Sequence, residues 1–172
     1  DVDPLSLLID PDQVEAKITS HTKAVTAVDY SGHPVDYDTL RTITEAHGIT
    51  LLADACHSLG ATYKQRSVGS LADLNMFSFH PVKIITTAEG GAATTNDAEL
   101  AQKMDLFRSH GVTRDEALMA QSSHGPWYYE QIELGYNYRI TDVQAALGSS
   151  QMKRLDGNVS RRHEIAEQYA SK

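Results

Sequence analysis

A lysine at position 83 stands alone between two short apolar runs, within the sequence FSFHPVKIITTAEGGA of residues 77–92. Pro81 on one side and the Glu-Gly-Gly stretch at 89–91 on the other are typical of turns, so Lys83 is expected on a loop between two strands. Surface lysines usually have other charges beside them, and Lys83 has none. This setting suits an amine held inside a site for Schiff-base chemistry. On spacing alone, an ordinary loop lysine is the simpler interpretation.

Asp54 is the second residue whose position favours chemistry, because it closes the apolar run ITLLADA of residues 49–55. Open α/β sheets place ligand-binding groups where such strands end. A helix cap or an Asx-turn would explain this carboxylate equally well. Together with His57 and His80, Asp54 also permits a metal-dependent hydrolase, since Asp-x-x-His can supply two metal ligands. That alternative lacks a clear third ligand and leaves Lys83 unexplained.

The elements around these residues follow the pattern of an α/β sheet with parallel strand pairs. Residues 23–29 predict a strand, Asp36 caps a helix that Gly48 ends, and residues 49–55 predict a strand buried on both faces. Strand, helix and strand in this order indicate a parallel βαβ unit. Two further strands are expected at 75–79 and 91–95. No G-x-G-x-x-G motif follows any of them, which argues against a Rossmann dehydrogenase.

The remaining segments are expected to form three helices separated by irregular stretches. Asp10 and Pro11 begin a short helix, and a β-ribbon is possible within the irregular residues 57–71. Asn96 or Asp97 caps a helix that ends at Gly111, and residues 112–135 are expected to form a long loop. A last helix starts at Asp142 and bends near Gly157-Asn158. The residues expected to face inward are Leu100, Met104 and Phe107 in the first of these two helices, and Val143, Ala146, Leu147, Met152 and Leu155 in the second.

Composition limits the class of protein. With 172 residues, of which 41% are hydrophobic, the chain is long enough for one domain with a core. A net charge of −8 without a basic stripe argues against nucleic acid as a partner. No apolar run approaches the ~18 residues of a membrane helix, and DVDPLSLL does not resemble a signal peptide. The single cysteine, Cys56, is typical of a reducing compartment, so a cytoplasmic location is expected.

Three segments, SFHPVKIITTAEGGA, DACHSLGA and GYNYRITDVQAALG, closely resemble the sugar-nucleotide aminotransferases of the DegT/DnrJ/EryC1/StrS family, which use pyridoxal 5'-phosphate (PLP). The segment GPWYYEQIELGYNYRITD is most similar to the subgroup that aminates C4 of a UDP-linked 4-keto-6-deoxy-N-acetylhexosamine on the way to pseudaminic acid. The resemblance implies part of the three-layer large domain of a fold type I PLP-dependent aminotransferase. Residues 1–172 would be a partial PLP-binding large domain, ending in the helix that leads toward a C-terminal domain, and would be inactive alone.

The family motifs imply a role for each candidate residue. Asp54 would hold the pyridine nitrogen of PLP, and Lys83 would hold the cofactor as an imine and then move the proton between donor and cofactor. Ser78, five residues before the lysine, would reach a phosphate oxygen. His57 would lie near the phenolic oxygen, although a structural histidine is almost as good an interpretation. His80 has no role beyond lining the pocket.

The resemblance also implies a homodimer with shared active sites. The family asparagine that matches Asn137 binds the PLP phosphate of the neighbouring subunit, whereas within one chain it would be a turn residue. Arg139 would stabilise the same loop or a phosphate. Three aromatic residues, Trp127, Tyr128 and Tyr129, suit packing or contact with a nucleotide. The implied substrates are a nucleotide-linked keto sugar and glutamate, and a PLP-fold regulatory protein remains the alternative.

Overall fold

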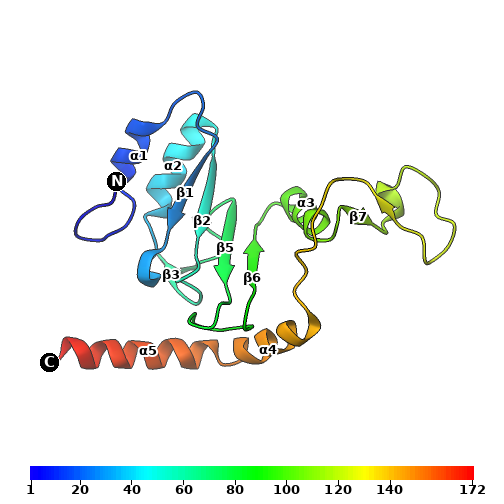
Figure 1. The fold of residues 1–172 in the computed structure, drawn as a ribbon. Helices are drawn as coiled ribbons and strands as arrows, with labels where there is room; N and C mark the ends of the chain where they lie inside the picture. Colours follow the sequence, from blue (N-terminus) through cyan, green and yellow to red (C-terminus); the bar gives the residue numbers. More distant parts are fainter. The chain divides into compact units, whose positions relative to one another are not determined.

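A four-stranded sheet organises the larger of two compact units in this computed structural model, which describes residues 1–172 (Figure 1). This first unit comprises residues 1–95 and 142–172, and the second comprises residues 96–141. The sheet order is β1 (Ala24–Val28), β2 (Thr50–Asp54), β5 (Leu74–Ser78) and β6 (Gly91–Thr94). β1, β2 and β5 run parallel, and β6 is antiparallel to β5. The predicted parallel βαβ unit is confirmed.

Two helices pack beside this sheet, and their ends follow from the capping residues. The Asp10 carboxylate accepts backbone N–H groups at the start of α1 (Pro11–Lys17). Asp36 does the same for α2 (Tyr37–His47), which ends at Gly48 in the left-handed conformation with φ 63°. α2 contacts β2, and α1 contacts α2. Both predicted helix starts and the predicted glycine stop are confirmed.

The core lies on the face of the sheet toward α2. Successive side chains of a strand point to opposite faces, so alternate residues of β1 and β2 enter the core while the others do not. On β1, Ala24, Thr26 and Val28 are exposed, and on β2 the positions between the core residues are only half-buried. The expectation that the strand at 49–55 is buried on both faces is therefore wrong for one face. The main buried apolar residues of this core are Val25, Ala27, Val35, Tyr37, Leu40, Leu51, Ala53, Ala55 and Phe77.

A small ribbon follows β2. β3 (Thr62–Tyr63) pairs antiparallel with β4 (Arg66–Ser67), within a region expected to be irregular with a ribbon as one possibility. Lys64 donates to Asp38 on α2 at 2.7 Å, Arg66 also pairs with Asp38, and the Tyr63 hydroxyl donates to Asp36 at 2.6 Å. These contacts attach the ribbon to the first turn of α2.

The C-terminal part of the first unit differs from expectation in two ways. α4 (Asp142–Met152) and α5 (Leu155–Ala170) are separated at residues 153–154, not near Gly157-Asn158. Gly157 lies inside α5 in open surroundings, so nothing there requires a bend. The predicted inward face is also wrong, because Val143 is 82% and Leu147 38% exposed. α4 instead buries Gly148, a small residue, against its neighbours.

The second unit contains α3 (Ala98–Arg108), capped by Asp97 as predicted. The helix ends at Arg108 rather than at Gly111, and Phe107 on its expected inner face is 47% exposed. The expected loop at 112–135 holds a short antiparallel pair, β7 (Val112–Thr113) with β8 (Glu130–Gln131), and the 3-10 turn η2 (Glu116–Leu118). Across the chain, every helix falls short of the length and apolar character that a bilayer-crossing segment needs.

A buried carboxylate joins three segments of the first unit. Asp29 follows β1 and is inaccessible to solvent. Its Oδ2 accepts the hydroxyls of Ser58 at 2.6 Å and Tyr37 at 2.9 Å, and its Oδ1 accepts the Val35 N–H at 3.0 Å. Burial, followed by the charge of Asp29, raises the pKa of Tyr37 far above its ordinary value, so the phenol stays a donor. Asp29 thus connects the exit of β1, the start of α2 and the loop after β2.

Removal of this carboxylate should destabilise the protein strongly. Asp29→Ala leaves the buried hydroxyls of Tyr37 and Ser58 without their acceptor, and we expect the free energy of unfolding to fall by about 3 kcal/mol. Urea denaturation followed by circular dichroism measures the change. Asp38→Ala is the control and should leave the midpoint nearly unchanged, because its ion pairs are exposed. Equal shifts for the two variants would contradict the assignment.

Candidate active site at the carboxyl edge of the sheet

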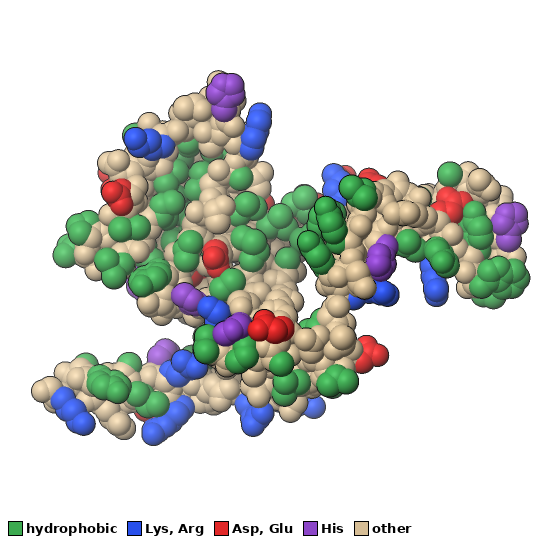
Figure 2. Space-filling model, viewed as in Figure 1, with side chains coloured by type: hydrophobic (Ala, Val, Ile, Leu, Met, Phe, Trp, Pro, Cys, Tyr) green, Lys and Arg blue, Asp and Glu red, His purple; other side chains and the backbone are tan.

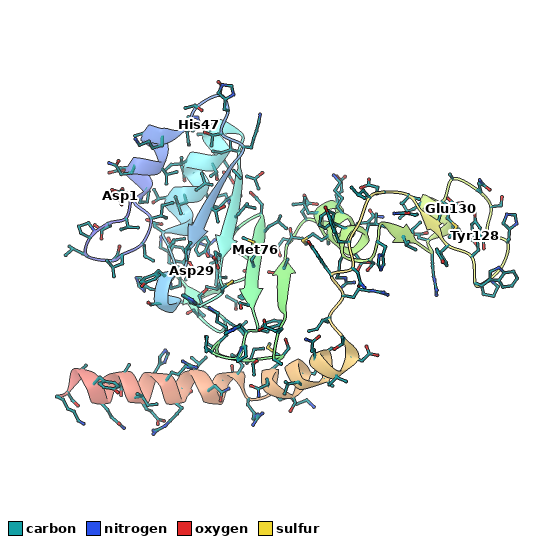
Figure 3. All side chains as sticks on the ribbon, viewed as in Figure 1. Asp1, Asp29, His47, Met76, Tyr128 and Glu130 are labelled. Atoms are coloured by element: carbon teal, nitrogen blue, oxygen red, sulfur yellow. The ribbon has the colours of Figure 1, made fainter.

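The three parallel strands end at one edge of the sheet, and polar residues follow or close each of them. Asp29 comes directly after β1, Asp54 closes β2 and Ser78 closes β5. Figure 3 labels Asp29 at this edge, and Figure 2 shows histidine, lysine and acidic side chains gathered there. Ligand sites of open α/β sheets lie at this edge, so the topology brings the predicted residues of the first unit together.

Asp54 and Ser78 share the face of the sheet that α2 does not cover. Asp54 pairs in register with Met76, and Ser78 is two residues further along the same strand. Residues paired in register, and residues two apart on a strand, point to the same face. The Asp54 carboxylate is half-buried, and its Oδ1 accepts the N–H of Cys56 at 3.1 Å. A carboxylate offers about four lone-pair sites, so Asp54 keeps capacity for a further donor.

Cys56 links Asp54 with Lys83. Burial, then a hydrogen bond to Asp54 and the charge of Asp54, raise the pKa of the Cys56 thiol to about 11, and the nearby Lys83 charge opposes this rise. The thiol therefore lies within electrostatic reach of both groups. Asp54 and Lys83 therefore both act electrostatically on the same thiol, and their joint role in one site stays a prediction.

The loop that carries Lys83 is anchored at both ends. The Lys83 N–H donates to the His80 carbonyl at 3.0 Å, which closes a tight turn. Further along, the Phe79 carbonyl accepts the Thr87 N–H at 3.0 Å and the Thr86 hydroxyl at 3.1 Å. Thr87 is almost fully buried. Lys83 thus lies on a short segment with fixed ends, and its amine makes no hydrogen bond or ion pair within the chain.

α4 supports this loop through two residues that the sequence analysis missed. The Gln144 side chain donates to the Glu89 carbonyl at 2.9 Å. Four residues later on the same helical face, a Cβ at Gly148 would come within 2.8 Å of the Thr87 methyl group. Gln144 reaches a backbone carbonyl of the loop, and Gly148 leaves room for the Thr87 methyl group. Their (i, i+4) spacing was the available signal, which the search for apolar residues passed over.

Ser78 and His80 form a local network beside Lys83. The Ser78 hydroxyl accepts the His80 N–H at 3.3 Å, so its own proton is free to be donated elsewhere. His80 Nδ1 accepts the Val82 N–H at 3.4 Å, and Nε2 lies 3.9 Å from a Glu89 carboxylate oxygen. His80 therefore spans the two ends of the Lys83 loop, a structural role that the sequence analysis did not identify.

His57 lies at the same edge, next to an aromatic residue that follows β1. It is exposed, and the ring centroids of His57 and Tyr30 are 6.4 Å apart. The neighbouring Ser58 is held by the buried Asp29. The sequence analysis singled out neither Asp29 nor Tyr30, although the rule that selected Asp54 at the end of β2 applies equally at the end of β1.

Asn137 and Arg139 belong to the second unit. Asn137 is exposed and forms an isolated bridge with Ser109 at the end of α3. Trp127 and Tyr129 are exposed, while the Tyr128 hydroxyl donates to Glu130 at 2.8 Å. The hydrogen bond from Tyr128, followed by the Ala120 N–H, lowers the pKa of Glu130. The roles implied for these residues toward phosphate and nucleotide stay predictions.

The residues of the first unit match the groups of PLP in kind. A carboxylate at Asp54 suits a protonated ring nitrogen, the free amine of Lys83 suits a carbonyl carbon, and the free proton of Ser78 suits a phosphate oxygen. No three His, Cys, Asp or Glu side chains gather closely enough to hold a metal ion, and Asp54, His57 and His80 form no such group.

Comparison with known proteins places these motifs among sugar aminotransferases. The model of the DegT/DnrJ/EryC1/StrS aminotransferase family matches residues 1–172. The UDP-4-amino-4,6-dideoxy-N-acetyl-beta-L-altrosamine transaminase of Campylobacter jejuni is 43% identical over 164 residues, which are 94% of this chain and 41% of that protein. Across the curated relatives it matches, the chain spans less than half of their length.

Solved structures give the same fold. Helicobacter pylori PseC, an aminotransferase involved in pseudoaminic acid biosynthesis, superposes with a TM-score of 0.87 at 38% identity, covering 95% of this chain and 42% of that one. The PLP-form of the putative sugar aminotransferase Spr1654 from Streptococcus pneumoniae has a TM-score of 0.83 at 33% identity, covering 99% and 46%. Aminotransferases of the matched family use PLP, and the fold is that of fold type I enzymes.

The Cys56 thiol offers a measurement of the site that needs no catalysis. Its pKa should be about 11, and the rate of alkylation by iodoacetamide should rise with pH up to that value. Asp54→Asn should lower the pKa because a hydrogen bond and a negative charge are lost. Lys83→Ala should raise it further because a nearby positive charge is lost. Lys153→Ala is the control, and a shift there as large as in Lys83→Ala would contradict the proximity of Lys83 to Cys56.

Proposed function

We propose, because the chain belongs to the DegT/DnrJ/EryC1/StrS aminotransferase family, that the protein transfers an amino group to the keto group of a nucleotide-linked 4-keto-6-deoxy sugar. Glutamate is the proposed donor, and the reaction serves bacterial surface-polysaccharide or pseudaminic acid biosynthesis. The names of the Campylobacter and Helicobacter relatives support this substrate class. The observation that carries the proposal is that Asp54 and Ser78 share one face at the carboxyl edge of the sheet, where the anchored loop with Lys83 follows β5.

Asp54 is proposed to hold the ring nitrogen of the cofactor. When bound, PLP supplies a conjugated ring that accepts the electron pair released at Cα of the amino donor. The Asp54 carboxylate keeps the proton on the ring nitrogen, because a negative charge at hydrogen-bonding distance favours the protonated form. The Cys56 N–H on Oδ1 fixes the orientation of this carboxylate.

Lys83 is proposed to act twice. Its amine holds the cofactor covalently, and once the amino donor has displaced it, the free amine carries a proton from Cα of the donor to C4′ of the cofactor. The anchored loop suits this role, since the bonds to the Phe79 carbonyl keep the lysine backbone in place when its side chain is released.

Ser78 and His57 are proposed to hold the other ends of the cofactor. The Ser78 hydroxyl has a free proton for a phosphate oxygen, and an imidazole N–H of His57 suits the phenolic oxygen. Asn137 is proposed to complete the phosphate site of a second copy, which makes the active protein a homodimer with shared sites. Residues 1–172 then form part of the PLP-binding large domain, and the half-buried Cys56 agrees with a reducing, cytoplasmic location.

Amino transfer through Lys83 is tested by trapping and substitution. The whole protein loaded with PLP should absorb near the visible edge, and borohydride reduction followed by digestion should label one peptide, which contains Lys83. Lys83→Ala should abolish both the label and transfer from glutamate, since covalent attachment and proton movement are lost together. The exposed Lys153 serves as the control. A label on another lysine rules the assignment out, and a protein that binds PLP without any transfer points to a regulator.

Asp54→Asn separates cofactor binding from chemistry. The amide should leave PLP bound but slow the first half-reaction with glutamate by orders of magnitude, because a neutral ring accepts the electron pair poorly. Single-turnover absorbance changes measure this step directly. Asp38→Asn, a surface change on α2, should leave the rate unaltered. A normal single-turnover rate in Asp54→Asn would remove the ring-nitrogen role.

Subunit mixing tests the role of Asn137. Lys83→Ala and Asn137→Asp should each be inactive, the second because a negative charge replaces an amide donor at a phosphate. Heterodimers of the two variants contain one site with both native residues, so part of the activity should return after subunit exchange. If mixed dimers stay inactive while each parent is folded and dimeric, Asn137 does not act across the subunit boundary.

A further inference from the structure

A groove runs between α5 and the loops that follow β1 and β2. Its volume is about 550 Å³, within the range of roughly 300–1,000 Å³ typical of small-molecule pockets. Gly32 and His57 line it from the loops, Ile84 from the Lys83 loop, and Arg162 and His163 from α5. Asp54, Ser78 and Lys83 do not line it. The groove is therefore a space beside the proposed cofactor site.

The only permanently charged side chain that lines the groove is positive. Arg162 is its permanent cation, His57 and His163 are further nitrogen donors, and no carboxylate lines the groove. Arg162 makes no ion pair or hydrogen bond within the chain. Its neighbour Arg161, by contrast, is paired with Glu164 at 2.6 Å. A free guanidinium in a hollow without acidic neighbours is suited to bind oxyanions.

The rest of the lining combines aliphatic side chains with the hydroxyl-bearing residues Ser31, Ser58 and Thr62. Leu59, Ile84 and Val159 contribute aliphatic surface to the groove. At Gly60, with φ 85°, a Cβ would lie 3.0 Å from a Val159 methyl group, so the loop after β2 rests directly on α5. The apolar surface beside Arg162 favours a ligand with a carbon skeleton over a bare inorganic ion.

We propose that this groove binds a small organic anion whose carboxylate or phosphate group pairs with Arg162. The guanidinium can donate two parallel N–H bonds to two oxygens of either group, and the aliphatic residues contact the ligand's carbon atoms. The protein carries a net charge of −8, so a general attraction for anions is absent and affinity depends on Arg162. The groove shares His57 with the proposed cofactor site, but Asp54, Ser78 and Lys83 do not line it.

Calorimetric titration of the whole protein tests the groove with three probes. Glutarate carries carboxylates without a reactive amine, uridine diphosphate carries phosphates on a carbon skeleton, and inorganic phosphate is the bare ion. Glutarate or uridine diphosphate should bind more tightly than inorganic phosphate, and added salt should weaken binding. Arg162→Ala should weaken it by about 10- to 100-fold, whereas Arg161→Ala should change it less than about twofold. The probe that depends on Arg162 identifies the carboxylate or the phosphate as the natural head group.

A second pair of variants guards against indirect effects of Arg162. Ala166 is an exposed residue of α5 that lines the groove, and Ala166→Glu places a carboxylate there. It should abolish binding by charge repulsion, while Ala166→Gln, of similar size, should weaken it only slightly. Lys153→Ala should bind glutarate as the unsubstituted protein does, because this exposed lysine does not line the groove and is not proposed to hold the cofactor. Binding of every probe unchanged by Arg162→Ala and Ala166→Glu would overturn the proposal.

Discussion

Because β1, β2 and β5 run parallel, the chain leaves all three strands at the same edge of the sheet, and the features of the site depend on this. Asp54 and Ser78 acquire a common face from strand register alone. The loops behind them still need support, since parallel strands provide no tight hairpins. The buried Asp29 carboxylate provides part of it by binding Tyr37, Ser58 and the Val35 backbone.

The Lys83 loop is held by a different kind of contact. Its ends are joined by hydrogen bonds to the Phe79 carbonyl, and α4 contacts it from the side through Gln144 and Gly148. The lysine backbone is thereby fixed while its side chain stays unpaired. The role proposed for Lys83, which includes covalent attachment, release and proton transfer, benefits from this division between a fixed backbone and a free amine.

Local chemistry accounts for what the sequence predicted well. The caps at Asp10, Asp36 and Asp97 and the stop at Gly48 depend on neighbouring backbone groups, so short-range rules found them. The parallel pairing followed from strand order. The predicted inner face of α4 was wrong, because the helix buries Gly148 against the Thr87 side chain, whereas Val143 and Leu147 are exposed. Arg162 was missed because its surroundings come from distant segments. Asp29 was missed although it follows β1 in the way that Asp54 closes β2.

Gly148 has a consequence for how substitutions in this protein are interpreted. It lies on a helix far along the chain from Lys83 and contacts Thr87, yet even a methyl group there would come within 2.8 Å of the threonine side chain. An alanine at this position would require the buried Thr87 side chain, the loop or the helix to shift. A mutational scan scored by activity would therefore rank Gly148 among the reactive residues, although its role is to leave room for the loop.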